Sequence, residues 1–287
     1  MDVSTKHTSR PVNHALTCLT WRALLLGLFV GGAVGCARYD MSAKYSSPQR
    51  AGRGMVVILP GIEGEGPANW DIRDGLYEAG VPYALVIYRW GTMVPGPGGM
   101  LLNQTDAPGN RRAARELALQ IAGYQASNRG KPVFLIGHSA GGGIAIFTLE
   151  ELGKLDGVEP IEGAVLLSAS LSANYPLDGA LRMVRRGIVN VHNPADPVLM
   201  AGSGLLGNVD GGHGASAGRT GFSRAYGKVF ERLISEQDVW RETGYAVFPH
   251  FLATQTAMIR KYASPWLLSR TWPPPNADVE RWAWAGP

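Results

Sequence analysis

The chain has 287 residues, of which 45% are hydrophobic, which is enough to bury the core of one globular domain with additional segments. Its net charge is +4, but the basic residues are scattered, with short clusters only at residues 111–115 and 185–186. No basic stripe with interleaved aromatic residues is present. Nucleic acid is therefore excluded as an expected partner, and the excess charge is attributed to a solvated surface.

The N-terminus has the pattern of an export signal. Lys6, Arg10 and Arg22 supply positive charge, and an apolar run follows over residues 23–32. Because this run is too short to span a bilayer as an ordinary helix, it predicts a signal peptide over residues 1–35 rather than a membrane anchor.

The residues after the apolar run predict lipidation of Cys36. The small residues 33–35 before this cysteine resemble the bacterial lipobox, although Ala33 stands where Leu is usual. Cys18 is the only other cysteine and would leave with the signal, so an unmodified mature chain would keep one unpaired thiol. We therefore expect an exported lipoprotein, held on a membrane by its N-terminal lipid and facing the periplasm or the extracellular side. The alternative is ordinary cleavage that leaves Cys36 free.

The rest of the chain is expected to contain a tether, one domain and a tail. Residues 36–52 are mostly polar and without periodicity, which is typical of a tether. Apolar runs alternate with helical patterns over residues 53–270, which predicts an α/β fold with a mostly parallel sheet and helices on both faces. Residues 271–287 contain three consecutive prolines and form the expected C-terminal tail.

Short apolar runs predict the strands of this domain, and longer amphipathic patterns predict its helices. Strands are expected at 54–59, 83–88, 133–136, 164–167, 188–191 and 245–248. Helices are expected at 69–80, 110–128, 144–152, 226–240 and 252–268. The Gly- and Pro-rich segments 91–109 and 197–225 are expected to be irregular.

Two segments match the pattern G-x-S-x-G, and their contexts differ. Residues 137–141, which contain Ser139, follow an apolar strand and precede a helix. That is the context of a strained turn that exposes a nucleophilic hydroxyl above the sheet edge. Residues 214–218, which contain Ser216, lie in a Gly-rich segment with no strand before them. The first match therefore predicts the nucleophile, and the second is interpreted as a structural turn.

The motif at 137–141, together with Leu59, Pro60 and Gly61 upstream, resembles α/β-hydrolases of the lipase and esterase type. The resemblance extends over residues 54–268. It implies an α/β-hydrolase fold without a cofactor, in which an acid and then a histidine follow the serine along the chain.

The resemblance implies that the acid follows the next strand but one after the nucleophile. Asp196 meets this requirement, because it comes just after the predicted strand 188–191. Asp210 is the alternative. The carboxylate would orient an imidazole, which in turn takes the proton of the serine hydroxyl.

The histidine is expected to be His250, which follows the predicted last strand and precedes the last helix. His213 is the alternative, although it lies among glycines and away from any predicted strand. His138, inside the turn, is expected to point away from the partner of Ser139, and His192, on the strand before the acid, is expected to be structural. The remaining two histidines lie in the export signal.

Two backbone N–H groups are expected to bind the oxyanion of the tetrahedral intermediate. One is that of Ala140, directly after the nucleophile. The other is that of Ile62, in the loop after the first strand, where Pro60 stands in place of the histidine of many relatives. No H-E-x-x-H motif, cysteine cluster or phosphate-binding loop is present, so no metal or cofactor is expected.

These residues predict a serine hydrolase that cleaves small acyl-ester substrates through an acyl-enzyme. Thioesters and amides use the same triad and stay open as substrates, as does the oligomeric state. The alternative from another functional class is a catalytically silent, lipid-anchored binding module. The apolar residues of 91–109 are interpreted either as a lid or acyl-pocket wall, or as a loop packed on the domain.

Overall fold

The computed structural model describes residues 39–40, 43–92 and 94–275. The chain divides into two units, Met1–Ala37 and Arg38–Pro287, and every element described below belongs to the second unit. The predicted export signal and Cys36 lie outside the described residues. Among the helices of the described part, none is long and apolar enough to cross a membrane.

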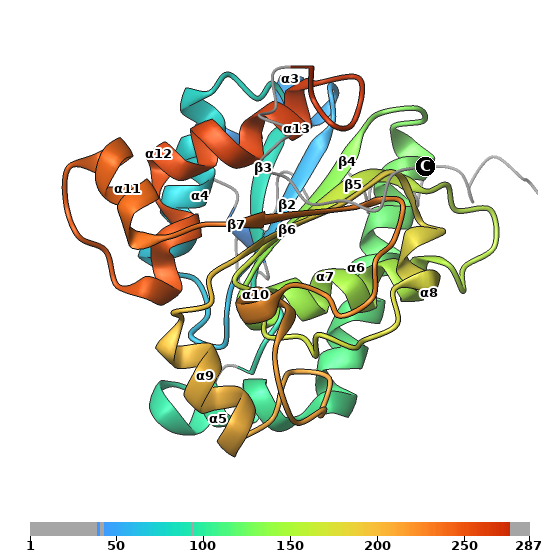
Figure 1. The fold of residues 1–287 in the computed structure, drawn as a ribbon. Helices are drawn as coiled ribbons and strands as arrows, with labels where there is room; N and C mark the ends of the chain where they lie inside the picture. The colour runs from blue at the N-terminus through green and yellow to red at the C-terminus, as the bar shows by residue number, and fades with distance from the viewer. Residues whose placement is uncertain (1–38, 41–42, 93, 276–287) are drawn as a thin grey trace, which may run out of the picture. The chain divides into compact units, whose positions relative to one another are not determined.

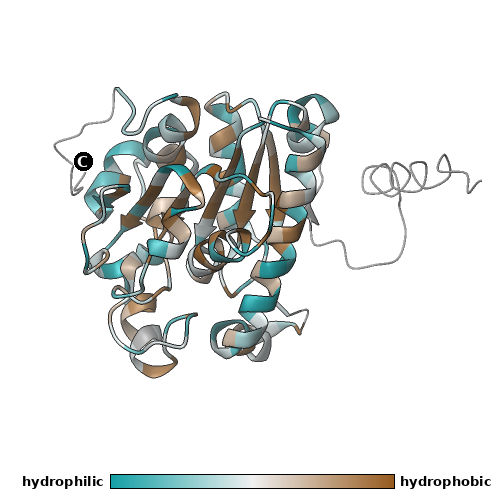
Figure 2. Cartoon of the chain, turned by 90° about the vertical axis from the view of Figure 1, so that its right-hand side faces the viewer, coloured by the Kyte–Doolittle hydropathy of each residue, from teal (hydrophilic) through white to brown (hydrophobic). Residues whose placement is uncertain are grey.

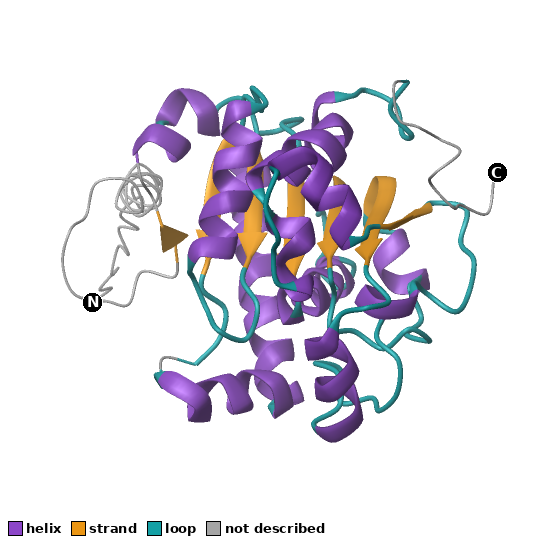
Figure 3. Cartoon of the chain, turned by 60° about the vertical axis from the view of Figure 1, so that its left-hand side comes forward, coloured by secondary structure: helices purple, strands orange, loops and turns teal. Residues whose placement is uncertain are grey.

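One sheet forms the centre of the domain (Figure 1). In the described residues it has seven strands in the order β1-β3-β2-β4-β5-β6-β7. Their bounds are β1 Tyr39–Asp40, β2 Met55–Leu59, β3 Ala84–Tyr88, β4 Val133–His138, β5 Ile161–Leu167, β6 Val184–His192 and β7 Val229–Leu233. The strands from β2 to β7 pair in parallel, whereas β1 is antiparallel to β3. The carboxyl ends of the parallel strands therefore meet at one edge, toward which the arrowheads point in Figure 3.

Helices cover both faces of this sheet, because successive side chains along each strand point to opposite faces and both sets are apolar. Val57 and Leu59 of β2 pack into one apolar layer, and Val56 and Ile58 into the other. Figure 2 shows the strands as strongly hydrophobic, as expected when both faces are buried. The first layer contains α6 (Ala107–Ser127), α7 (Ala140–Leu152) and α8 (Asp178–Leu181). The second contains α4 (Pro67–Glu78), α12 (Thr256–Met258), a π-helical turn (Ile259–Ala263) and α13 (Ser264–Leu268). The predicted fold class, a mostly parallel sheet with helices on both faces, is confirmed.

The helix predicted over 226–240 is wrong. Its first half is β7, whose residues Val229 and Phe230 pair with β6 and are buried. A separate helix, α11 (Glu236–Thr243), begins after Ser235, whose hydroxyl accepts from the N–H of Asp238 in a capping box. The strand predicted at 245–248 is also absent, so β7 is the last strand of the described chain.

The two segments expected to be irregular contain helices: α5 (Gly96–Thr105), α9 (Pro197–Leu205) and α10 (Ala217–Thr220). Their glycine content lowers helix propensity, but contacts outside each helix compensate. Asn103 of α5 donates to the carbonyl of Ile62 (2.8 Å) and also accepts from the N–H of Thr92 (2.7 Å). The carboxylate of Asp196 caps the first turn of α9.

The segment predicted as a tether is ordered against the domain from residue 43. It forms α2 (Ala43–Ser46) and α3 (Pro48–Ala51), and Tyr45 is buried in the second apolar layer. The guanidinium of Arg50 donates to the carbonyls of Val81 (2.6 Å) and Tyr83 (2.9 Å). In the predicted tail, the indole of Trp272 donates to the carbonyl of Trp266 (2.6 Å). The domain therefore uses residues from both predicted extensions.

Candidate active site

Ser139 occupies a strained turn between β4 and α7. Its backbone has φ 53° and ψ −123°, a left-handed conformation that non-glycine residues rarely adopt. Two hydrogen bonds hold the turn: Ser139 N donates to the carbonyl of Leu167 at the end of β5, and its carbonyl accepts from Ser170 N, both at 2.9 Å. The serine thus lies at the carboxyl edge of the sheet, with only 5% of its surface exposed.

The two glycines of the motif are required by close backbone packing around this turn. A Cβ atom on Gly137 would lie 2.3 Å from the carbonyl oxygen of Gly141. A Cβ atom on Gly141 would lie 2.2 Å from the carbonyl oxygen of Leu59 and 2.4 Å from that of Pro60. The start of α7 is therefore pressed against the end of β2 and the loop that follows it.

We expect Gly141→Ala to destabilise the fold by about 2 kcal/mol or more, because the backbone has to move to admit the methyl group. Gly123→Ala is the matched control. Gly123 lies within helix α6, and a Cβ atom added there would meet nothing within 4 Å. This control should be neutral or stabilising by up to about 1 kcal/mol. Urea unfolding of the two variants measures both effects, and equal midpoints would contradict the steric argument.

The surroundings of Ser216, in the second G-x-S-x-G match, indicate a structural role. It forms an isolated bridge with Ser172 and directly precedes the short helix α10. A Cβ atom on Gly218 would lie 2.1 Å from the backbone nitrogen of Ala169. This second motif therefore packs along the chain after β5, and it contains no strand-to-helix turn.

Asp196 is completely buried and uses both carboxylate oxygens. Oδ1 accepts from the N–H groups of Val198 (2.9 Å) and Leu199 (3.0 Å), which begin α9. Oδ2 accepts from Nδ1 of His250 at 2.7 Å. The helix N-terminus stabilises the negative charge and fixes the orientation of the carboxylate, so the second oxygen is held toward the imidazole.

His250 is buried in the 3₁₀ helix Pro249–Thr254. Because its Nδ1 donates to Asp196, the neutral ring carries its proton there and Nε2 is left as an acceptor. Burial lowers the pKa of His250, and the neighbouring His138 lowers it further, while Asp196 acts in the opposite direction. The imidazole is therefore kept neutral near pH 7.

The two alternative residues lie in other environments. His213 is exposed to solvent. Asp210 accepts from the backbone N–H of Ser172 at 3.1 Å through Oδ1, a contact that holds the loop after β5. The pair that the structure brings together is therefore Asp196 and His250.

The expectation that His138 points away from the base is wrong. Its ring centroid lies 4.9 Å from that of His250, and its Nε2 donates to the carbonyl of His250 at 3.2 Å. Its Nδ1 lies 3.5 Å from the carboxylate of Glu63, a residue that the sequence analysis did not select. Burial acts to raise the pKa of Glu63, but the neighbouring imidazole outweighs it and the net effect is a lowered pKa. His138 thus connects the residue after it, Ser139, to the loop that carries His250.

The loop after β2 forms a tight turn around Ile62, the residue predicted to supply the second oxyanion donor. Gly64 N donates to the carbonyl of Gly61 at 3.1 Å, so Ile62 lies inside a tight turn whose hydrogen bond does not use its N–H. The indole of Trp90 donates to the carbonyl of Pro60 (2.7 Å) and orients the start of the loop. Ala140 is the first residue of α7, and such an N–H has no acceptor within its own helix.

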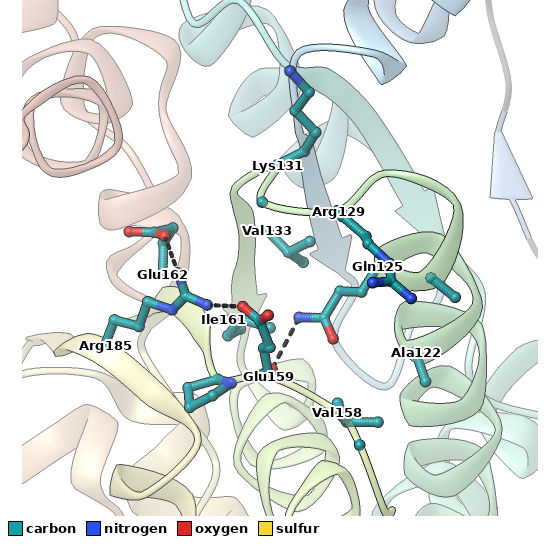
Figure 4. Close-up of a pocket in the computed structure, with 14 residues that line it drawn as sticks. Ala122, Gln125, Arg129, Lys131, Val133, Val158, Glu159, Ile161, Glu162 and Arg185 are labelled. Carbon is teal, nitrogen blue, oxygen red and sulfur yellow. Dashed lines mark hydrogen bonds and ion pairs between the residues drawn. The ribbon is translucent and has the colours of Figure 1, made fainter.

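Two surface hollows differ in their relation to this site. One, of about 370 Å³, adjoins the loop after β2 and is lined by Trp70, Trp90 and the ion pair of Arg89 with Glu65. The other, of about 240 Å³, lies at the amino ends of β4 and β5, the opposite edge of the sheet (Figure 4). Ion pairs of Arg185 with two glutamates line that second hollow. The lining of the first hollow includes Glu63, the neighbour of His138, but none of Ser139, Asp196 and His250. No group of three metal-binding side chains occurs in the described residues.

Comparison with known proteins places several hydrolases among the similar folds. No family model and no curated protein matches the chain. A dienelactone hydrolase-like promiscuous phosphotriesterase from metagenomic libraries is 15% identical, with a TM-score of 0.42 over 73% of this chain and 85% of that one. Aspergillus fumigatus lipase B is 13% identical, with a TM-score of 0.49 over 88% of this chain and 62% of the lipase. The esterase domain of a Rhodothermus marinus protein is 13% identical, with a TM-score of 0.41 over 79% and 89%. At these identities the neighbours assign neither substrate nor catalytic residues.

Proposed function

We propose that this chain is a serine hydrolase that cleaves carboxylic esters through an acyl-enzyme on Ser139, with Asp196 and His250 completing the triad. The observation that carries the proposal is the buried carboxylate–imidazole pair, 2.7 Å long, whose histidine lies against the residue preceding Ser139. A strained serine turn and an oriented imidazole at the same sheet edge are the parts that acyl transfer requires.

The reaction proceeds by two acyl transfers. Ser139 Oγ attacks the ester carbonyl carbon while Nε2 of His250 takes its proton, and Asp196 stabilises the imidazolium that forms. The N–H groups of Ala140 and Ile62 donate to the oxyanion. Collapse of the intermediate expels the alcohol, which receives the proton from His250. Water, activated by the same imidazole, then releases the carboxylic acid and restores the serine.

Reaction with a fluorophosphonate probe tests this function most directly, because the probe modifies only an activated serine. We expect one modified peptide, containing Ser139, when the full chain is labelled and mapped by mass spectrometry. Heat-denatured chain is the control and should not react. Labelling at Ser216, or none by a folded protein, would contradict the proposal and favour a silent binding module.

The rate of this labelling should depend on pH through His250. The base must be neutral, so the rate falls as the pH decreases through its pKa. Because burial lowers this pKa, the midpoint should lie below the ordinary histidine value of about 6.5. Second-order labelling rates measured between pH 4 and 9 check this, using the range in which circular dichroism shows native structure. A midpoint above the ordinary value would contradict the assignment of His250.

We also propose that Cys36 carries lipid and holds the protein on a membrane facing the periplasm or the extracellular side. The support is the run of small residues before the cysteine and the absence of a second cysteine in the expected mature chain. Mass spectrometry of the mature N-terminus, from a host with lipoprotein processing, should find an acylated Cys36. An unmodified terminus at or beyond Cys36 would exclude this anchor.

A further inference from the structure

Two helices of the domain present apolar side chains to solvent. Neither α5 nor α9 contains a charged residue. Exposed fractions range from 38% for Met100 to 81% for Leu205. We call the seven exposed large apolar residues of these helices and of the position directly after α9 the apolar rim: Met100, Leu101, Leu102, Val198, Met200, Leu205 and Leu206.

The apolar rim lies at the same sheet edge as Ser139. The chain leaves the carboxyl end of β3 before α5, and α9 begins at Pro197, shortly after the carboxyl end of β6. Both helices lie below the sheet in Figure 1. The buried side chain of Gln104 in α5 links the two helices, because its Nε2 donates to the carbonyl of Gly207, shortly after α9 (2.7 Å). The same Nε2 also donates to Ser170 Oγ (3.0 Å). Ser170 N in turn donates to the carbonyl of Ser139. Hydrogen bonds through Gln104 and Ser170 therefore connect the helices that carry the rim to the backbone of Ser139.

The N-terminal end of the domain lies at this edge as well. Tyr39 of β1 pairs with Tyr88, the last residue of β3, which places the start of β1 at the carboxyl ends of the parallel strands. Cys36 precedes Tyr39 by three residues, which reach at most about 11 Å. A lipid on Cys36 would consequently hold the active-site edge, rather than the opposite edge, next to a bilayer.

We propose that the apolar rim docks on the lipid bilayer and that the substrates are esters dissolved in that bilayer. The proposal rests on the proposed function and on lipidation of Cys36. An uncharged apolar surface gains free energy when it leaves water for the acyl boundary of a membrane. Its position at the same sheet edge as Ser139 gives docking a catalytic consequence, because a long acyl chain then passes from lipid to enzyme without crossing water.

Docking is tested without relying on catalysis. A polarity-sensitive fluorophore is attached to Leu205→Cys in the full, lipidated chain, and to Leu268→Cys as the control. Leu268 is 47% exposed and ends α13, which lies at the far end of the domain in Figure 1. Adding phosphatidylcholine vesicles should shift the emission to the blue at position 205 and not at 268, after subtracting the signal of the labelled parent. Equal shifts, or none, at the two positions would overturn the proposal.

The substrate class is tested with the variants Leu101→Ser/Leu205→Ser and Leu268→Ser. For a long-chain ester embedded in phosphatidylcholine vesicles, the rim variant should lose about tenfold or more in rate, because two apolar side chains no longer enter the bilayer. Turnover of a short soluble ester should stay within about twofold, and the control should resemble the parent on both. Equal vesicle rates for parent and rim variant would overturn the proposal. If the parent hydrolyses neither ester, the proposed function fails, and the fluorescence result still decides the docking.

Discussion

Replacing Ser139 with alanine should lower kcat on short p-nitrophenyl esters by at least about 10⁴-fold. In the proposed mechanism the hydroxyl forms the covalent bond, so no other group of the triad replaces it. The turn itself should persist, since its two hydrogen bonds to the chain around β5 use backbone atoms only. Steady-state kinetics with circular dichroism and thermal unfolding measure both consequences on the same sample.

Ser216→Ala provides the matched control for this variant, because it changes the serine of the other G-x-S-x-G segment. Ser216 lies in a turn beside Ser172 and has no acid–base pair among its described contacts. Turnover by Ser216→Ala should therefore resemble that of the parent. If Ser139→Ala keeps the parental kcat while folded, the nucleophile is assigned to the wrong residue.

His250→Ala should reduce kcat by several orders of magnitude, close to the loss caused by Ser139→Ala. The serine hydroxyl loses its proton acceptor, and the members of a triad act as one unit, so removing one removes most of the effect. The truncation also leaves the buried carboxylate of Asp196 without its 2.7 Å partner. Full kcat and KM values at pH 8, together with denaturant unfolding, separate the loss of catalysis from a loss of stability.

The exposed His213 supplies the comparison for this second variant. His213→Ala should keep kcat within about twofold, because surface substitutions away from a network have small effects. A double variant of Ser139 and His250 should be no slower than either single variant, as non-additivity requires. A folded His250→Ala enzyme with normal kcat, beside an inactive His213→Ala enzyme, would reverse the assignment.

The local patterns of the sequence determined the central strands and the strand-to-helix turn that contains the proposed nucleophile. Continuous apolar runs are sufficient for β2 to β6, because strands buried on both faces need no alternation. The position of Ser139 followed from a strand, a helix and glycines within a few residues of one another. The prediction of Asp196 followed from the strand order that the resemblance to α/β-hydrolases implies, together with recognition of each strand.

The tertiary structure alone decided the elements whose stability comes from distant contacts. The residues of β7 have a helical pattern, but all five of them, Val229–Leu233, pair with β6 in a parallel ladder. The Gly-rich α5 and α9 are poor helix formers, and they are stabilised by Asn103, Gln104 and the cap of Asp196. Propensity is a weak preference compared with these contacts.

The same distinction holds within the candidate site. His250 was predicted from its place after a short strand, but the structure has a 3₁₀ helix there, and the pairing with Asp196 positions the ring. The contacts of His138 with Glu63 and His250 join segments far apart in the chain. No local pattern encodes such contacts, because they form only when parallel strands bring three loops to one edge of the sheet.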